Sequence, residues 1–358
     1  MFSACGGSKR CVDAPFSRVF SIYHPADSIP PARPGRAPSL HSPMKKAFLE
    51  LHLSVLLAGW TGIFGKLLSL SPGLIVFWRI VIASALLWGW IAWRRTAEAV
   101  SSRDKIGIML VGVLLMLQWT LFYASIKASN VSIAIVAFSS MGFFTALVEP
   151  LLTRTRVSMK EIAFSVLTLV GISFIFHFDT QYRTGILLGI TSAAAAAVLE
   201  VFFRKYKAKY RAQTVMSWQL LGGLAGALVL LPGYRMLTPP EPFLPTGIDI
   251  LHLLIFASFC TIGMYLLQIQ ALERISAFTV NLTYNLEPVY SIILAMIIFH
   301  EARDLGPSFY FGIGCIAASV LLQTWSVMRI QRRVARADRE RAALPAAERP
   351  ETPREMKL

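Results

Sequence analysis

The sequence contains few charged residues and few cysteines, and each shortage excludes a class of protein. Only 15% of its 358 residues are charged, whereas a soluble domain carries about 25%. The four cysteines form no disulfide framework, because two lie in the N-terminal tail and two lie in apolar segments. Cysteines and histidines do not pair at metal-ligand spacing, and no Gly-x-x-x-x-Gly-Lys-Ser/Thr motif occurs. We therefore expect no metal, no cofactor and no nucleotide-driven reaction.

The sequence is instead rich in long apolar blocks. Hydrophobic residues make up 55% of the chain, and the mean hydropathy is +0.57. These residues fall in blocks of about 20, the length of a helix that crosses a bilayer, rather than in amphipathic stripes. The formal net charge of +15 comes from basic residues in short loops and at both ends. This distribution favours contact with anionic lipid and argues against a nucleic-acid partner.

The two ends of the chain differ from the rest. Residues 1–43 are rich in Pro, Ser and Arg and lack an apolar run, so we expect a disordered extension without a signal peptide. Met44 then begins a new composition abruptly. Either an upstream start codon was chosen in error, or residues 1–43 are a true cytoplasmic extension. Residues 329–358 form a basic cytoplasmic tail, expected to be a helix at the lipid surface that then frays.

Between these ends, apolar length and breaker clusters predict ten helices. The predicted ranges are 47–69, 72–93, 106–125, 130–151, 158–178, 184–205, 213–232, 249–271, 276–299 and 305–328. The fold class is thus an all-α integral membrane protein.

The basic residues in the loops predict the orientation of these helices. Thirteen lie on one side, namely Arg94, Arg95, Arg103, Lys105, Arg154, Arg156, Lys160, Arg204, Lys205, Lys207, Lys209, Arg211 and Arg274. Four lie on the other side, namely Lys127, Arg183, Arg235 and Arg303. Because cytoplasmic loops carry the excess of Lys and Arg, both termini are predicted in the cytoplasm, in a bacterial inner membrane.

The two halves of the chain resemble each other. Residues 77–79 match 217–219 around a shared Trp, and residues 141–145 fall on 287–291 at an offset of 146. Five helices per half is an odd number, so the second half is predicted to be inverted relative to the first. Inverted repeats place a substrate site near the bilayer midplane and permit alternating access. The predicted repeats span residues 44–178 and 184–328.

The predicted helix 276–299 has a polar centre. Glu287 lies near its middle and is followed by Pro288, which removes a backbone N–H and predicts a bend. A carboxylate at that depth should face a protein interior or a wet cavity. Asn281, Tyr284 and Asn285 lie on the same approach. This centre predicts a substrate or ion site, and a structural kink around a satisfied Glu is the alternative.

Other polar and aromatic residues lie within the predicted spans. Arg79 is suited to a carboxylate or phosphate, and snorkelling or pairing with a structural acid is equally open. Gln118 is predicted to line a cavity, and Trp60 to stack on a solute or simply to pack. Snorkelling is expected for Lys66, and an interfacial position for Trp119.

The region from about Lys45 to Val327 resembles the EamA-type members of the drug/metabolite transporter superfamily. The resemblance rests on the two five-helix halves, Trp78-Arg79, Leu286-Glu287-Pro288-Val289 and His300-Glu301. In that family the last motif typically reads Gly-Glu, and the first half usually carries Ser-Pro where this chain has Met141-Gly142. The resemblance implies transport of a small organic solute such as a metabolite, an amino acid or a drug.

We therefore expect a secondary active transporter, not an enzyme, that exports its solute by proton coupling or exchange. Its partners would be the solute and the lipid bilayer, and a homodimer is one open assembly. A membrane-embedded enzyme is the first alternative, but the helix centres lack the paired acids or Ser/His groupings that it needs. A receptor or assembly factor is the second, although such proteins usually carry a sizeable soluble domain.

Overall fold

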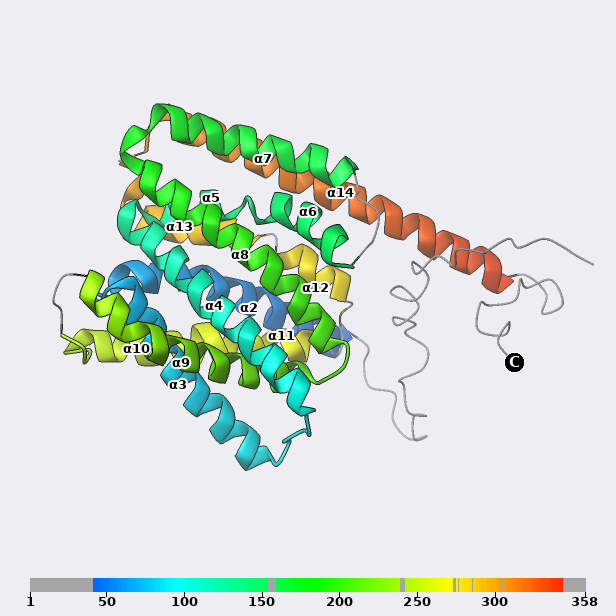
Figure 1. Cartoon of the computed structure of the whole chain (residues 1–358). Helices are drawn as coiled ribbons and strands as arrows, with labels where there is room; N and C mark the ends of the chain where they lie inside the picture. The colour runs from blue at the N-terminus through cyan, green and yellow to red at the C-terminus, as the bar shows by residue number, and fades with distance from the viewer. Residues whose placement is uncertain are drawn as a thin grey trace, which may run out of the picture. The chain divides into compact units, whose positions relative to one another are not determined.

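The computed structural model describes residues 41–153, 159–238, 242–272, 275, 277–284, 286–303 and 305–343, and these residues contain helices but no strand (Figure 1). Most of the N-terminal extension and the last part of the basic tail lie outside the described residues, and so do the predictions made for them. The described residues from Pro43 onward belong to one compact unit.

Seven stretches of the described residues are long and apolar enough to cross a membrane. Five are single helices: α2 (His41–Leu67), α3 (Pro72–Arg94), α4 (Ser102–Ala128), α8 (Arg183–Lys207) and α9 (Ala212–Leu237). Two are interrupted: α5 (Val131–Phe138) with α6 (Met141–Thr153), and α10 (Ile248–Ala257) with the π-helical η2 (Ser258–Gly263) and α11 (Met264–Leu272).

Three shorter apolar helices complete the set, at Ile162–His177, Glu287–Ile298 and Pro307–Leu322. They belong to α7 (Met159–Phe178), α13 (Glu287–Ile298) and α14 (Pro307–Ala343); α12 (Ala277–Tyr284) precedes α13, and the short turns η1 (Thr180–Tyr182) and η3 (Glu301–Arg303) follow α7 and α13. Each predicted apolar segment therefore contains helix in the described residues, although some segments are interrupted or end earlier than predicted. The count of ten membrane crossings stays a prediction.

The helix around Glu287 differs from the prediction. One bent helix over 276–299 was expected, but the described chain has two, since α12 ends at Tyr284 and α13 begins at Glu287. Pro288 lies in the first turn of α13, where its missing N–H has no helical partner to lose. Because a proline and a fresh helix start coincide here, the chain breaks rather than bends.

A second broken helix occupies the corresponding place in the first half. There α5 ends at Phe138 and α6 begins at Met141. From the start of α5 to the start of α12, and from the start of α6 to the start of α13, the chain advances 146 residues in each case. This separation equals the offset at which residues 141–145 align with 287–291. The halves thus share a local pattern of interruption, while their inverted orientation stays a prediction.

Glycines permit close crossings between the helices. A Cβ added at Gly112 of α4 would lie 1.9 Å from the backbone oxygen of Gln219, and one at Gly222 of α9 would lie 2.1 Å from that of Met109. Helices α7 and α14, which run side by side in Figure 1, also cross closely: a Cβ at Gly171 would lie 2.5 Å from the backbone oxygen of Gly312, and one at Gly312 would lie 2.7 Å from that of Gly171. Only a residue without a side chain allows backbones to touch in this way.

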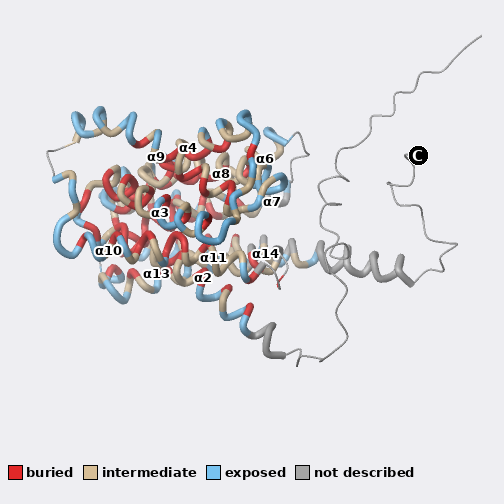
Figure 2. Tube along the Cα trace, turned by 90° about the horizontal axis from the view of Figure 1, so that it is seen from below, coloured by how far each residue is buried: buried red, intermediate tan, exposed pale blue. Residues whose placement is uncertain are grey.

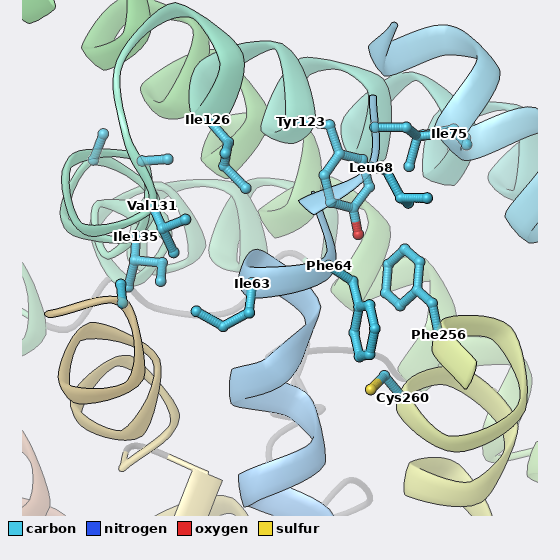
Figure 3. Packing of buried hydrophobic residues seen from close by; sticks show 14 of the residues in the cluster. Ile63, Phe64, Leu68, Ile75, Tyr123, Ile126, Val131, Ile135, Phe256 and Cys260 are labelled. Carbon is cyan, nitrogen blue, oxygen red and sulfur yellow. The ribbon is translucent and has the colours of Figure 1, made fainter. Parts of the chain in front are cut away.

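The largest buried cluster lies where α2, α3, α4, α5 and the α10–η2 segment meet. Figure 2 shows buried backbone concentrated inside the helix bundle and exposed residues along its outer turns. Phe64 of α2, Tyr123 of α4 and Phe256 of α10 point toward one another in Figure 3, with Cys260 of η2 beside them. This cluster supports the polar groups described next.

Candidate functional site

Arg79 lies deep inside the helix bundle, and only 4% of it is exposed. Its Nε donates to the Thr261 hydroxyl at 3.0 Å, and its Nη1 donates to the Tyr123 hydroxyl at 2.6 Å. No described carboxylate forms an ion pair with it. Snorkelling and pairing with a structural acid, the two alternatives for Arg79, are thus not what the described residues show. A buried guanidinium without a protein counter-ion can accept an anionic group.

Two aromatic rings hold the guanidinium in place. Its central carbon lies 3.8 Å from the centroid of the Trp119 ring and 4.3 Å from that of the Phe256 ring. Contacts of this kind stabilise a cation that has left water. Trp119 was predicted at the membrane interface, but it packs on Arg79 because the two side chains meet between α4 and α3.

Trp60 joins this aromatic group indirectly. Its ring lies 5.9 Å from Phe64, which stacks on Phe256 with centroids 5.6 Å apart. Phe256 in turn meets the Tyr123 ring edge-on at 6.0 Å. Trp60 is therefore packed against the core, in line with the simpler of its two readings.

The π-helical turn η2 supplies the hydroxyl that receives Arg79. Thr261 accepts from Arg79 and donates to the carbonyl of Phe256 at 3.3 Å, five residues earlier. A π-helical turn widens the helix by one residue and is frequent at functional sites. Nothing in the sequence pattern of this span predicted the widening.

Glu287 is the first residue of α13 and is half-buried. No described residue donates a hydrogen bond to its carboxylate or forms an ion pair with it. The positive end of the α13 dipole favours a negative charge at this position. The alternative prediction, a structural Glu with satisfied oxygens, is therefore not supported by the described residues.

Tyr123 bonds to Arg79 and lies within electrostatic range of Glu287. The carboxylate lies within electrostatic reach of Tyr123 and of Tyr284, and the Tyr123 hydroxyl is bonded to Arg79. The described structure thus places an acid, a phenol and a guanidinium in one neighbourhood, contributed by α13, α4 and α3. Tyr123 is a link that the sequence patterns did not select, because its role depends on contacts between distant helices.

Tyr284 joins three helices near Glu287. Its hydroxyl bonds to Ser54 of α2, whose own hydroxyl donates to the carbonyl of Met264 at 2.9 Å. Since Ser54 uses its single hydrogen on Met264, Tyr284 is the donor to Ser54. Tyr284 thus lies beside the break and ties α12 to α2, while Ser54 ties α2 to α11.

The remaining predicted site residues divide into two groups. Gln118 is buried, and its side-chain amide donates to Ser192 of α8 at 3.0 Å, while Ser192 donates to the backbone carbonyl of Gln118 at 3.0 Å. This pair joins α4 to α8, and the role of Gln118 in lining a cavity stays a prediction. The Asn281 side chain and the whole of Asn285 lie outside the described residues.

A second polar group surrounds Glu301, just after α13, and only 1% of this residue is exposed. One carboxylate oxygen accepts from Lys66 at 2.8 Å and from the Val131 N–H at 3.0 Å. The other accepts from the N–H and the hydroxyl of Ser132, at 2.9 and 2.6 Å. Glu301 therefore joins α2, the first turn of α5 and η3, and we name this group of four residues the Glu301 latch.

The electrostatics of the latch favour the ionised acid. Burial raises the pKa of Glu301, but the hydrogen bonds from Lys66, Ser132 and Val131 outweigh it and hold the pKa below its usual value. Snorkelling was expected for Lys66, yet its ammonium binds Glu301 and lies 4.5 Å from the Phe299 ring centroid. The Lys66 ammonium thus binds the buried carboxylate of Glu301 instead of extending to the membrane interface.

No group of three His, Cys, Asp or Glu residues that could hold a metal occurs in the described part of the chain. Two surface hollows, with volumes of about 510 and 730 Å³, are lined by residues other than Arg79 and Glu287. The first lies between the start of α4 and the end of α8, and the second lies between α7 and α8.

The amino-acid sequence matches a known protein family. The sequence model of the EamA-like transporter family matches this chain twice, over residues 46–177 and 183–325. An uncharacterized transporter of Archaeoglobus fulgidus is 25% identical over 293 residues, which cover 78% of this chain and 97% of that protein. An uncharacterized transporter of Haemophilus influenzae is 23% identical over 69% of this chain and 84% of that protein.

A solved crystal structure also matches, with a TM-score of 0.53 and 16% identity over 78% of this chain and 97% of the other, a likeness that shows the fold alone. The two family matches together cover most of the chain and point to a transporter rather than an enzyme. The predicted resemblance is confirmed: the chain is a multi-pass membrane protein that belongs to the EamA-like transporter family.

Proposed function

We propose that this protein is a secondary active transporter that exports a small organic solute, such as a metabolite, an amino acid or a drug. In this proposal the transport is coupled to protons or proceeds by exchange. The observation that carries it is Glu287, a half-buried acid at the start of a broken helix, without a partner among the described residues. Such an acid can bind a proton or a cationic group reversibly, whereas a paired acid would have to break its bonds first.

The proposed mechanism is alternating access between two inverted five-helix repeats, residues 44–178 and 184–328. The family match to each half and the two helix breaks 146 residues apart support it. Inverted repeats commonly place discontinuous helices at a central site. In the structure the Glu301 latch joins α2, α5 and η3 at one end of the bundle, so we infer that this end is closed here. Opening it requires that the latch separate.

The proposed location is the bacterial inner membrane with both termini in the cytoplasm, supported by the thirteen-to-four asymmetry of basic loop residues. The Glu301 latch would then face the periplasm. Cysteine labelling from outside intact cells tests this orientation: a cysteine at Arg183 should react and a cysteine at Arg103 should not.

The test of the function is Glu287→Gln in proteoliposomes. Purified wild-type protein is first screened for solutes that raise its thermal stability, because a ligand of the folded state stabilises it. Solute-driven proton movement is then followed with an internal pH dye. We expect wild-type vesicles to respond and Glu287→Gln vesicles to lose the response and its pH dependence, since the amide keeps the shape of the side chain but cannot carry the proton.

Glu149→Gln is the matched control. It also removes one acid, but Glu149 accepts two hydrogen bonds from Arg204, at 2.9 and 2.8 Å, and is partly exposed. It should transport like wild type when rates are normalised to inserted protein. Wild-type transport by Glu287→Gln at every pH would show that Glu287 does not carry the mechanism.

A further inference from the structure

We propose that the hollow between the first turn of α4 and the last turn of α8 binds the phosphate group of an anionic phospholipid. Its lining combines basic, hydroxyl and apolar side chains in a volume of about 510 Å³. The lining residues are Ser101, Arg103, Asp104, Ile106, Gly107, Leu110, Lys205, Tyr206 and Lys209. The inference is independent of the transport mechanism, since it concerns neither Glu287 nor Arg79.

The acid in this hollow is already neutralised. Asp104 accepts from Lys209 and from the Tyr210 hydroxyl, the latter at 2.6 Å, and from the Ser101 hydroxyl at 2.9 Å. The hydrogen bond to Asp104 raises the pKa of Lys209, so this pair stays charged and internally balanced. Asp104 therefore does not oppose an incoming anion with an uncompensated charge.

Two cations of the lining remain available. Arg103 of α4 and Lys205 of α8 are exposed and form no ion pair with any described residue. They approach the hollow from different helices, so one anion placed between them meets both. Basic pockets between transmembrane helices bind phospholipid head groups in this manner.

Tyr206 adds a hydrogen-bond donor to these cations. Its hydroxyl oxygen would lie 2.1 Å from a Cβ at Gly107, so the ring reaches α4 only because position 107 has no side chain. None of the described residues forms a hydrogen bond with this hydroxyl. A phosphate oxygen is a suitable acceptor for it, beside two positive charges.

The apolar wall selects a lipid over a free phosphate. Ile106 and Leu110 lie one turn apart on α4, and they are 62% and 64% exposed. Leu110 lies deeper in the membrane-spanning helix than Arg103, so the wall runs from the basic groups toward the bilayer interior. A free phosphate gains nothing from such a surface, whereas an acyl chain removes it from solvent.

The test uses the full chain, purified in detergent and stripped of lipid. Binding of phosphatidylglycerol and of phosphatidylcholine is titrated by native mass spectrometry, and inorganic phosphate is added as a competitor. We expect a preference for phosphatidylglycerol that millimolar phosphate does not abolish. In the double variant Arg103→Gln/Lys205→Gln the affinity should fall about thirtyfold, from the contribution of two basic residues near a charged surface. Tyr206→Phe should weaken binding less.

The matched control is Lys105→Gln/Lys207→Gln. It removes the same charge from the same two helices, but Lys105 and Lys207 are not among the residues that line the hollow. Their ammonium groups lie 4.9 Å from the Trp218 ring and 5.8 Å from the Phe203 ring, whereas that of Lys205 lies 5.9 Å from the ring of Tyr206, which does line it. This variant should bind phosphatidylglycerol like wild type. If both double variants bind phosphatidylglycerol equally weakly, the effect comes from the net charge alone, and the proposed binding site is wrong. Full competition by inorganic phosphate would overturn the assignment to a lipid.

Discussion

The two ends of the helix bundle hold their charges in different ways. At one end Glu301 is 1% exposed and accepts four hydrogen bonds from two other segments of chain, α2 and the first turn of α5. At the other end Glu149 and Arg204 pair with side chains that are 38% and 47% exposed, and Lys209 pairs with Asp104 near the surface. Ion pairs between a basic side chain and a carboxylate are thus buried between helices at one end and partly exposed at the surface at the other.

This difference indicates which end is harder to open. A buried acid with all of its acceptors used loses a complete set of bonds when its helices separate, and each orphaned donor then costs free energy. An exposed pair exchanges its partner for solvent at little cost. Under the proposed alternating-access mechanism, we infer that the Glu301 end is closed in this structure and that the end with the Glu149–Arg204 pair is the easier one to open.

The largest expected effect comes from removing the buried acid. Glu301→Ala should lower the free energy of unfolding by about 3 kcal/mol, because Lys66 and three backbone and hydroxyl donors lose their acceptor. Glu149→Ala should lower it by about 0.5 kcal/mol. Thermal unfolding of both variants in one detergent compares them. Equal losses of unfolding free energy in the two variants would show that the Glu301 end is no harder to open than the Glu149 end.

A smaller effect should follow from pH. The folded-state pKa of Glu301 lies below its unfolded value, so the latch stabilises the protein above the unfolded pKa, about 4.3. That stability is lost as the pH falls through the folded-state pKa, because the unfolded chain binds the proton more tightly. Melting temperatures between pH 7 and pH 3 should therefore fall less steeply for Glu301→Gln than for wild type. Parallel curves would show that the Glu301 carboxylate is not held in the ionised form.

The smallest effect concerns the backbone beside the latch. His300 has φ of 56°, in the left-handed region, where the related family typically carries Gly. A residue with a Cβ costs about 1 kcal/mol in this region, so His300→Gly should raise the unfolding free energy by up to that amount. Ala208→Gly is the control, since Ala208 has φ of −67° and ordinary helical geometry. That variant should be neutral or less stable, and destabilisation by His300→Gly would show that the imidazole makes a contact that outweighs the strain.

The candidate site was only partly predictable. Glu287, Pro288, Tyr284 and Arg79 could be selected because a charge, a proline or a phenol inside an apolar span is visible in the sequence itself. Trp119 and Lys66 were expected at the membrane interface, but the structure shows them in contact with Arg79 and Glu301. The predicted role of Gln118 in lining a cavity stays a prediction. The sequence offered one overlooked signal for the latch, the acid of His300-Glu301, whose buried position depends on donors more than 160 residues away.

The sequence by itself determined that this chain is helical, membrane-spanning and built from halves with a shared pattern. Apolar block length, breaker residues and the positions of Lys and Arg are local properties, so no distant contact was needed to recognise them. Only the tertiary structure decided which polar groups meet. Arg79 reaches Thr261 across 182 residues and Lys66 reaches Glu301 across 235. A partner inside the protein stabilises a buried charge, and helix packing rather than sequence distance determines which partner lies within reach.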